Sequence, residues 1–239
     1  MENTAVLPKR RAVSLILKCV VVIAAAVGVY ASYIGGLGAF MSGPRVFMFF
    51  TIQSNIAIAL ICAIGAVLLL TKGAVNNGWF ILKFVGTVAI TLTGAVFSFV
   101  LAPTLGDQAW NLRNTLTHVV VPIAAIADFF VTGVFGKLEK KHTFFGILPP
   151  LAYVIYAAVA YVNGWEFIPG KCYPYFFLNW GSPAGAFGFC GELPYMGCVW
   201  WILIGMALIL LLGLVYILIL NAMKRRNRNK LPRCKQRGI

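Results

Sequence analysis

Charged residues are scarce in this chain, and acidic residues most of all. Only 11% of the 239 residues are charged and six are Asp or Glu, whereas a soluble domain carries charge on about a quarter of its residues. The six acids are scattered and the two histidines are far apart in sequence, so neither a carboxylate cluster nor a zinc site is apparent. We expect no metal and no other cofactor.

Several familiar signatures are also missing. The chain has no G-x-S-x-G, no P-loop and no H-E-x-x-H. The strict polar–apolar alternation of membrane barrel strands is absent. No repeat of fixed period is visible, which weighs against the inverted repeats common in secondary transporters.

Long apolar stretches are abundant instead, because 61% of the residues are hydrophobic. A membrane-spanning helix needs about 20 mostly apolar residues, and its backbone groups must bond internally. Six stretches have that length. The sequence therefore predicts an all-α polytopic membrane protein, a six-transmembrane-helix bundle over 12–222, with a segment 1–11 before it and a basic tail 223–239 after it. The expected helices are 12–34, 46–71, 79–102, 111–135, 144–163 and 197–222.

The basic residues gather on one side of this predicted topology. Net charge is +14, and all lysines and arginines except Arg45, Arg113 and Lys171 fall on the side of the two termini. The positive-inside rule makes that side cytoplasmic, which fits a bacterial inner (plasma) membrane. The basic tail Lys224–Arg237 is interpreted as an anchor for anionic lipid. Nucleic-acid binding by the tail is the alternative, which we do not favour.

The N-terminal stretch has some features of a signal peptide. Lys9, Arg10 and Arg11 precede an apolar run, and small residues flank Tyr30. The run continues through Ile34, which is long for a signal core. We expect an uncleaved first helix.

The connector 164–196 is dense in Gly, Pro and aromatic residues. Aromatic side chains prefer the interface between lipid and water, so we expect an aromatic outer loop that covers the mouth of the bundle. A plain interfacial belt is the alternative. Cys172, Cys190 and Cys198 lie on the outer side, where two of them can form a disulfide; three separate thiols are the other possibility.

Polar residues inside membrane helices are costly and suggest function. Thr51, Ser54 and Asn55 are three and four residues apart and share one helix face. Asn114 and His118 share a face of the fourth predicted helix. Thr51 and His118 lie roughly 8 and 10 Å below the outer ends of their expected helices, so a hydroxyl and an imidazole at similar depth form a possible nucleophile and base. The alternative is that these groups only hydrogen-bond helices together.

Two further titratable residues are weaker candidates. Asp128 lies in the same helix as His118, ten residues further on and turned to another face. It is either protonated, bonded to a polar neighbour, or part of a proton relay. His142 follows Lys140 and Lys141 in an expected solvated loop and is a poor candidate for catalysis.

Three segments carry a resemblance to a known family. They are Phe49–Asn55 (FFTIQSN), Asn114–His118 (NTLTH) with Pro122, and Tyr173–Asn179 (YPYFFLN). Together they resemble the bacterial Pr-six-Pr family of integral membrane proteins, over about residues 12–222. That family is similar to the eukaryotic androgen-induced and androgen-dependent transmembrane proteins, which are threonine hydrolases of fatty acid esters of hydroxy fatty acids. The long outer loop departs from the eukaryotic pattern.

The resemblance implies that Thr51 is the nucleophile and His118 the base of an intramembrane lipid ester hydrolase. Asn55, Asn114 or Ser54 would orient the histidine or donate to the oxyanion. The expected partners are membrane lipids and an amphipathic lipid ester. Two other classes stay open: a small-molecule or ion transporter, with a polar path continuing toward Asp128, and a non-catalytic structural or signalling protein, with no cavity.

The charge distribution generates a topology prediction. A reporter that works only in the cytoplasm should be active when it is fused after Ile239, because the basic tail lies on the same side as the other inner loops. The matched fusion within 164–196 should report the opposite side. Periplasmic activity of the Ile239 fusion would overturn this orientation.

Overall fold

The computed structural model describes residues 4–5, 8–35, 43–72, 74–133 and 136–229. Within them, six helices are long and apolar enough to cross a membrane. The predicted all-α polytopic bundle is therefore confirmed, and the protein is a multi-pass membrane protein. The six spans are Pro8–Ile34, Phe50–Lys72, Asn77–Gln108, Leu112–Gly133, Lys140–Val162 and Cys198–Asn227.

Several spans are built from more than one helical element. The elements are β1 (Thr4–Ala5), α1 (Pro8–Ile34), η1 (Gly43–Met48), α2 (Phe50–Lys72), β2 (Ala74–Val75), α3 (Asn77–Val96), η2 (Phe97–Leu101), α4 (Ala102–Leu105), η3 (Gly106–Gln108), α5 (Leu112–Thr115), η4 (Leu116–Val120), α6 (Val121–Gly133), η5 (Lys140–Ile147), α7 (Leu148–Val162), η6 (Phe176–Leu178) and α8 (Cys198–Asn229). β1 and β2 form a two-residue antiparallel pair. η2 and η4 are π-helical turns.

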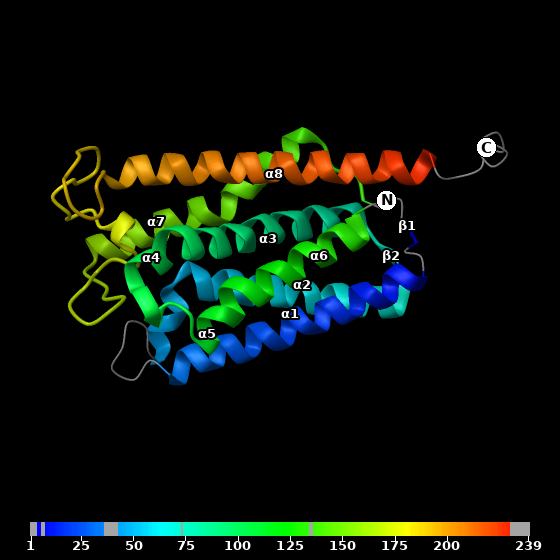
Figure 1. Cartoon of the computed structure of the whole chain (residues 1–239), viewed down its shortest axis with the longest axis horizontal. Coiled ribbons are helices and arrows are strands. Elements are labelled where there is room, and N and C mark those ends of the chain that lie inside the picture. The colour runs from blue at the N-terminus through cyan, green and yellow to red at the C-terminus, as the bar shows by residue number, and fades with distance from the viewer. Residues whose placement is uncertain (1–3, 6–7, 36–42, 73, 134–135, 230–239) are drawn as a thin grey trace.

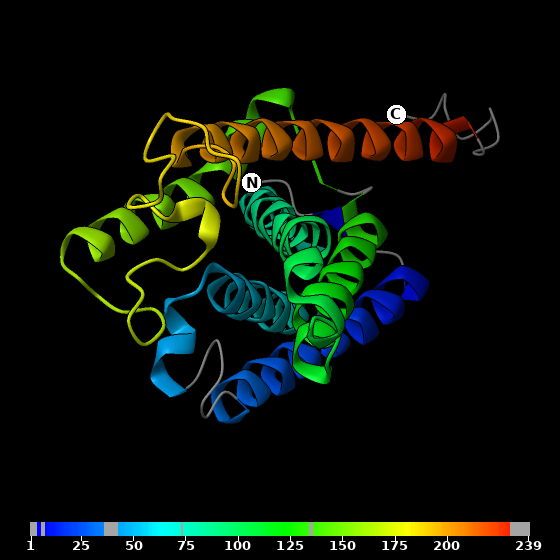
Figure 2. The ribbon, with the colours of Figure 1, turned by 60° about the vertical axis from the view of Figure 1, so that its left-hand side comes forward.

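The helices form one group of four with two more alongside. α1 packs on α2 and α6, and α3 packs on the other sides of α2 and α6. α8 lies along this group, with η5 and α7 beside it (Figures 1 and 2). The start of α1 and the end of α8 lie at one end of the bundle, here called the terminal end. The connector 164–196, the long loop, lies at the opposite or loop end.

Some helix boundaries differ from the expected ones. α2 begins at Phe50 rather than at residue 46, because Gly43–Met48 forms a separate 3₁₀ turn after the left-handed Gly43. Thr51 therefore lies in the first turn of α2, not a turn deeper. α1 begins before the expected residue 12, and α8 runs past residue 222 to Asn229. The last part of the basic tail, 230–239, lies outside the described residues.

A buried ion cluster joins three helices toward the terminal end. The Asp128 carboxylate of α6 is 0% exposed and lies 2.5 Å from Lys18 Nζ of α1 and 2.6 Å from Lys83 Nζ of α3. Ser14 Oγ donates to its other oxygen at 2.5 Å, and Lys83 also donates to Thr132 Oγ1 at 2.8 Å. Asp128 is thus bonded to polar neighbours. The two lysines counted among the inner-side charges are in fact buried.

The long loop packs on the bundle rather than extending from it. Phe167, Tyr175 and Leu178 are buried in one cluster with Phe49, which precedes α2, and with Tyr153 of α7. Edge-to-face ring contacts join Phe49 to both Phe167 and Tyr175. Every cysteine among the described residues is a free thiol. Cys172, Cys190 and Cys198, which were considered for a disulfide, are therefore three separate thiols.

The ion cluster generates a stability prediction. Asp128→Ala leaves two lysines buried without their counter-ion, so it should lower the free energy of unfolding by about 3–5 kcal/mol. Replacing the cluster with apolar residues (Lys18→Met, Lys83→Met and Asp128→Leu together) should restore most of that loss. The measurement is denaturant unfolding in detergent micelles, followed by tryptophan fluorescence. Asp107→Asn, at an exposed acid of η3, is the control; an Asp128→Ala effect no larger than the control's would contradict the prediction.

Candidate functional site

Two π-helical turns bring His118 and Phe97 together. His118 lies in η4 and Phe97 in η2. Their rings stack with centroids 3.7 Å apart and planes at 18°. The turns come this close because Gly94 precedes η2: a β-carbon there would lie 2.8 Å from the His118 carbonyl oxygen. Single π-helical turns within α-helices are frequent at functional sites.

The hydrogen bonds of His118 define its tautomer. Nδ1 lies 3.0 Å from the backbone carbonyl of Asn114, and a carbonyl only accepts, so Nδ1 carries the proton. Thr117 Oγ1 is also 3.0 Å from Nδ1 and donates its own proton to the Arg113 carbonyl. In the neutral ring, Nε2 then carries a lone pair, and it has no hydrogen-bond partner among the described residues. His118 therefore has the form that a general base requires.

Thr51 lies at the amino end of α2, against the long loop. Its Oγ1 and its backbone N–H both lie 3.4 Å from the Tyr175 hydroxyl, at the long end of hydrogen bonding. Burial raises the pKa of the Tyr175 phenol above its ordinary value, so this hydroxyl stays protonated at neutral pH. The positive end of the α2 dipole also favours negative charge at this position.

The other predicted site residues hold the helices in place. Asn55 donates both amide hydrogens, to Thr51 O at 2.8 Å and to Thr117 O at 3.1 Å, so it links the turns that carry Thr51 and His118. Ser54 bonds Thr93 of α3 at 2.8 Å and borders neither of the two cavities described below. The Asn114 amide donates to the Ala109 carbonyl. It is the backbone of Asn114, not its side chain, that orients His118.

Thr51 and His118 border the same cavity, of about 360 Å³, at the loop end. It is called the polar cavity here because polar residues predominate among those that line it, between apolar ones such as Ile52 and Phe97. No direct hydrogen bond joins the two side chains within the described part of the chain. Two cations, Arg113 and Lys171, and no acid are among the residues that line the cavity. The polar residues of its wall are Ser32, Thr51, Thr104, Gln108, Asn111, Arg113, Asn114, Thr117, His118, Lys171, Tyr173 and Tyr175.

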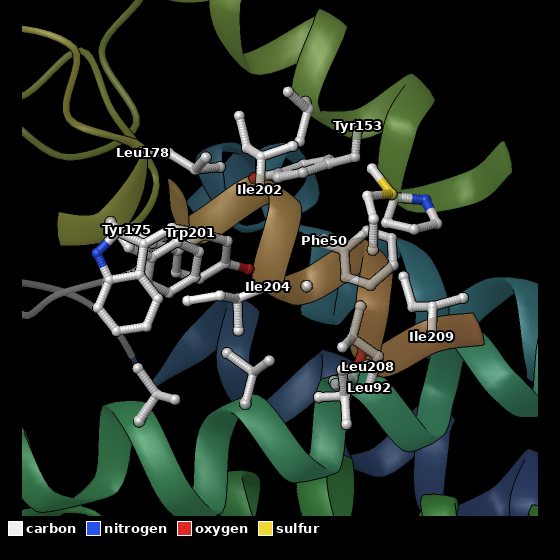
Figure 3. Close-up of a pocket in the computed structure, with 18 of the residues that line it drawn as sticks. Phe50, Leu92, Tyr153, Tyr175, Leu178, Trp201, Ile202, Ile204, Leu208 and Ile209 are labelled. Carbon is white, nitrogen blue, oxygen red and sulfur yellow. The ribbon is translucent and has the colours of Figure 1, made fainter. Parts of the chain in front are cut away.

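A second cavity, of about 160 Å³, is lined almost wholly by apolar side chains of α3, α7, α8 and the long loop. Figure 3 shows its lining, with Phe50, Leu92, Tyr153, Trp201 and Leu208 among the labelled residues. The walls of the two cavities share Thr51, Phe97, Leu101 and Tyr175. Thr51 thus stands at the boundary between a polar space and an apolar one.

Neither cavity includes a residue of the Asp128 cluster. Buried apolar residues of one packed core separate the Asp128 cluster from Thr51 along α2 and from His118 along α6. This core holds Ile58, Cys62, Ile90, Val121 and Ala125. Packed apolar residues therefore separate the cavity beside Thr51 and His118 from the Asp128 cluster.

His142 is not solvated, contrary to expectation. It is 7% exposed, and its Nδ1 accepts from the Glu139 N–H at 2.9 Å, which caps η5. The pKa of the exposed Glu139 carboxyl is lowered, first by its hydrogen bond to Lys141. His142 therefore has a local structural role, and it borders neither cavity.

Sequence reasoning missed three groups at the site. Tyr175 was one of many loop aromatics, and nothing in the sequence singles out the ring that reaches Thr51. Phe97 was an ordinary apolar helix residue, and its contact with His118 depends on π-helical turns that have no sequence signal. Thr117 does stand next to the histidine in NTLTH, and its position was the available clue.

Comparison with protein-family models, curated proteins and solved structures finds no match to this chain. Among the described residues, no group of three metal-ligating side chains comes together.

Proposed function

We propose that the protein is an intramembrane hydrolase of lipid esters, with Thr51 as nucleophile and His118 as base. One observation carries the proposal: Thr51 lies on the shared wall of a polar and an apolar cavity, and His118 lines the polar one. An amphipathic ester has one polar and one apolar side, so its carbonyl would lie at this boundary. This is also the role that the resemblance to the Pr-six-Pr family implies for the two residues.

The reaction proceeds in two steps. Thr51 Oγ1 attacks the ester carbonyl carbon and its proton passes to His118 Nε2, directly or through one water in the polar cavity. The protonated His118 then gives that proton to the leaving alcohol, which leaves an acyl ester on Thr51. Water gives a proton to His118 and attacks this ester. The fatty acid is released, and His118 returns the proton to Thr51 Oγ1, which regenerates the free hydroxyl.

Tyr175 and the Thr51 backbone N–H supply the oxyanion site. Both groups are donors beside Thr51 Oγ1, and the N–H has no other recorded partner in the described residues. A carbonyl oxygen placed between them would gain two hydrogen bonds as its negative charge develops. Preorganised donors of this kind are worth about 10²–10³ in rate each.

The charges of the polar cavity favour an anionic group on the alcohol half of the substrate. Arg113 and Lys171 line it with no neighbouring acid in that lining. A carboxylate or phosphate there would be neutralised, since a guanidinium pairs well with either.

The proposed setting is the bacterial inner membrane, with both termini cytoplasmic. An even number of spans returns the chain to the side where it began. Most of the exposed basic residues then lie on the cytoplasmic side, and the loop end with its two cavities faces the outer leaflet.

The central prediction concerns the two reacting side chains. Thr51→Ala and His118→Ala should each abolish lipid-ester hydrolysis by the purified protein, since each removes one half of a nucleophile–base unit. Thr51→Ser should keep part of the activity because it keeps a hydroxyl. The double mutant should be little slower than either single one.

The matched controls are Thr104→Ala, at another hydroxyl of the polar cavity, and His142→Ala, at the other histidine. Both should hydrolyse at close to the wild-type rate. Wild-type activity in Thr51→Ala or in His118→Ala would refute the mechanism and make the pair a packing contact between helices.

A second prediction concerns the oxyanion site. Tyr175→Phe should lower kcat about 10²–10³-fold with little change in KM, because the lost hydrogen bond forms mainly in the transition state. Tyr173→Phe, from the same loop and the same cavity wall, should have no comparable effect. An equal loss in the two variants would show that the loop, and not the Tyr175 hydroxyl, matters.

A further inference from the structure

The apolar cavity exists because α8 separates from the bundle toward the loop end. Nearer the terminal end, α8 is held firmly: Ile209, Tyr216 and Leu220 share a core with Phe84 and Val88 of α3. Tyr216 also hydrogen-bonds Thr91 at 2.8 Å. Toward the loop end, by contrast, α8 borders the cavity with Trp201, Ile202, Ile204, Gly205, Met206 and Leu208. Ile204 on this wall is 52% exposed.

The polar groups on the wall of the apolar cavity have hydrogen-bond partners, except at the end of the cavity beside Thr51. Thr93 Oγ1 is bonded to Ser54, and the Tyr153 hydroxyl donates to the Met48 carbonyl at 3.1 Å. The long contacts of Thr51 with Tyr175 remain as the polar end of an otherwise apolar space. An acyl chain with its carbonyl has this distribution of polarity.

Gly205 keeps the space open. A β-carbon at this position would have no heavy atom within 4 Å, and its backbone does not need a left-handed conformation. Glycine is disfavoured in the interior of a helix, and no close helix contact explains it here. What it does leave is free volume on the cavity wall.

We propose that the apolar cavity binds the acyl half of the ester. The acyl chain enters sideways from the membrane, between α8 and α3–η2. Gly205 limits the length of the acyl chain that the cavity accepts. The inference rests on the proposed function and assigns each half of its substrate: acyl chain beside α8, alcohol half beside His118. Membrane lipid is as apolar as the cavity. Selection therefore depends on shape and length, not on hydrophobicity.

The kinetic test uses Gly205→Trp, which fills the cavity from α8. Hydrolysis of p-nitrophenyl palmitate should fall by about 10-fold or more relative to p-nitrophenyl butyrate, since pockets discriminate by roughly 10–200-fold for small changes in fit. Leu203→Trp is the matched control, because Leu203 is 53% exposed and does not border the cavity. Its preference between the two esters should stay that of the wild type.

A binding test separates this inference from the hydrolase proposal. A palmitate analogue with a diazirine at its last carbon is irradiated with the purified wild-type protein, and labelled peptides are mapped by mass spectrometry. Labels should fall on cavity residues of α7 and α8, such as Val154 and Leu208. They should be lost in Gly205→Trp and kept in Leu203→Trp.

The outcomes are distinct. A wild-type protein without esterase activity that still labels in the cavity would refute the hydrolase and retain the acyl site. Labels confined to exposed helix faces, equal in both tryptophan variants, would overturn the acyl site. Equal losses on palmitate and butyrate in Gly205→Trp would overturn its role in chain length.

Discussion

Asp128 is the residue on which the arrangement of the bundle depends. A carboxylate inside a membrane bundle is tolerated only when it is paired and hydrogen-bonded, and here it meets Lys18 of α1 and Lys83 of α3. These three helices are thereby fixed to one another toward the terminal end. The apolar core above the cluster and the aromatic core of α3, α6 and α8 close this half of the molecule. The two cavities described above lie toward the loop end, where the long loop packs across the helices.

The site at that end is built from local departures from regular helix. The 3₁₀ turn η1 delays the start of α2, which places Thr51 in a first turn, where its N–H faces the Tyr175 hydroxyl. The two π turns displace Phe97 and His118 toward each other, and Asn55 holds the turn of Thr51 against that of His118. The long loop then contributes Tyr175. Three separate segments, α2, η4 and the long loop, thus supply the proposed nucleophile, base and oxyanion donor. They meet where a polar and an apolar cavity share a wall.

The fold was predictable because its main cause is visible in the sequence: six apolar stretches of membrane length fix the class and the number of spans. The charge count placed Lys18 and Lys83 among the inner-side cations, because charge alone does not show that both would form ion pairs with Asp128. Helix geometry placed Thr51 and His118 on the same side of the bundle, and they do border one cavity, but Thr51 lies a turn less deep in its helix than predicted. The ring that reaches Thr51, and the backbone carbonyl that orients His118, depend on loop packing and π turns, which single-sequence patterns do not encode.

The central claim is that Thr51 is a nucleophile that carries the acyl group during the reaction. The most direct measurement is labelling of the purified protein with a long-chain alkyl fluorophosphonate, followed by peptide mass spectrometry. The account predicts one stable adduct, on Thr51, that is abolished in His118→Ala and reduced by prior incubation with a lipid ester. An unlabelled Thr51, or an adduct on another hydroxyl that persists in His118→Ala, would contradict it.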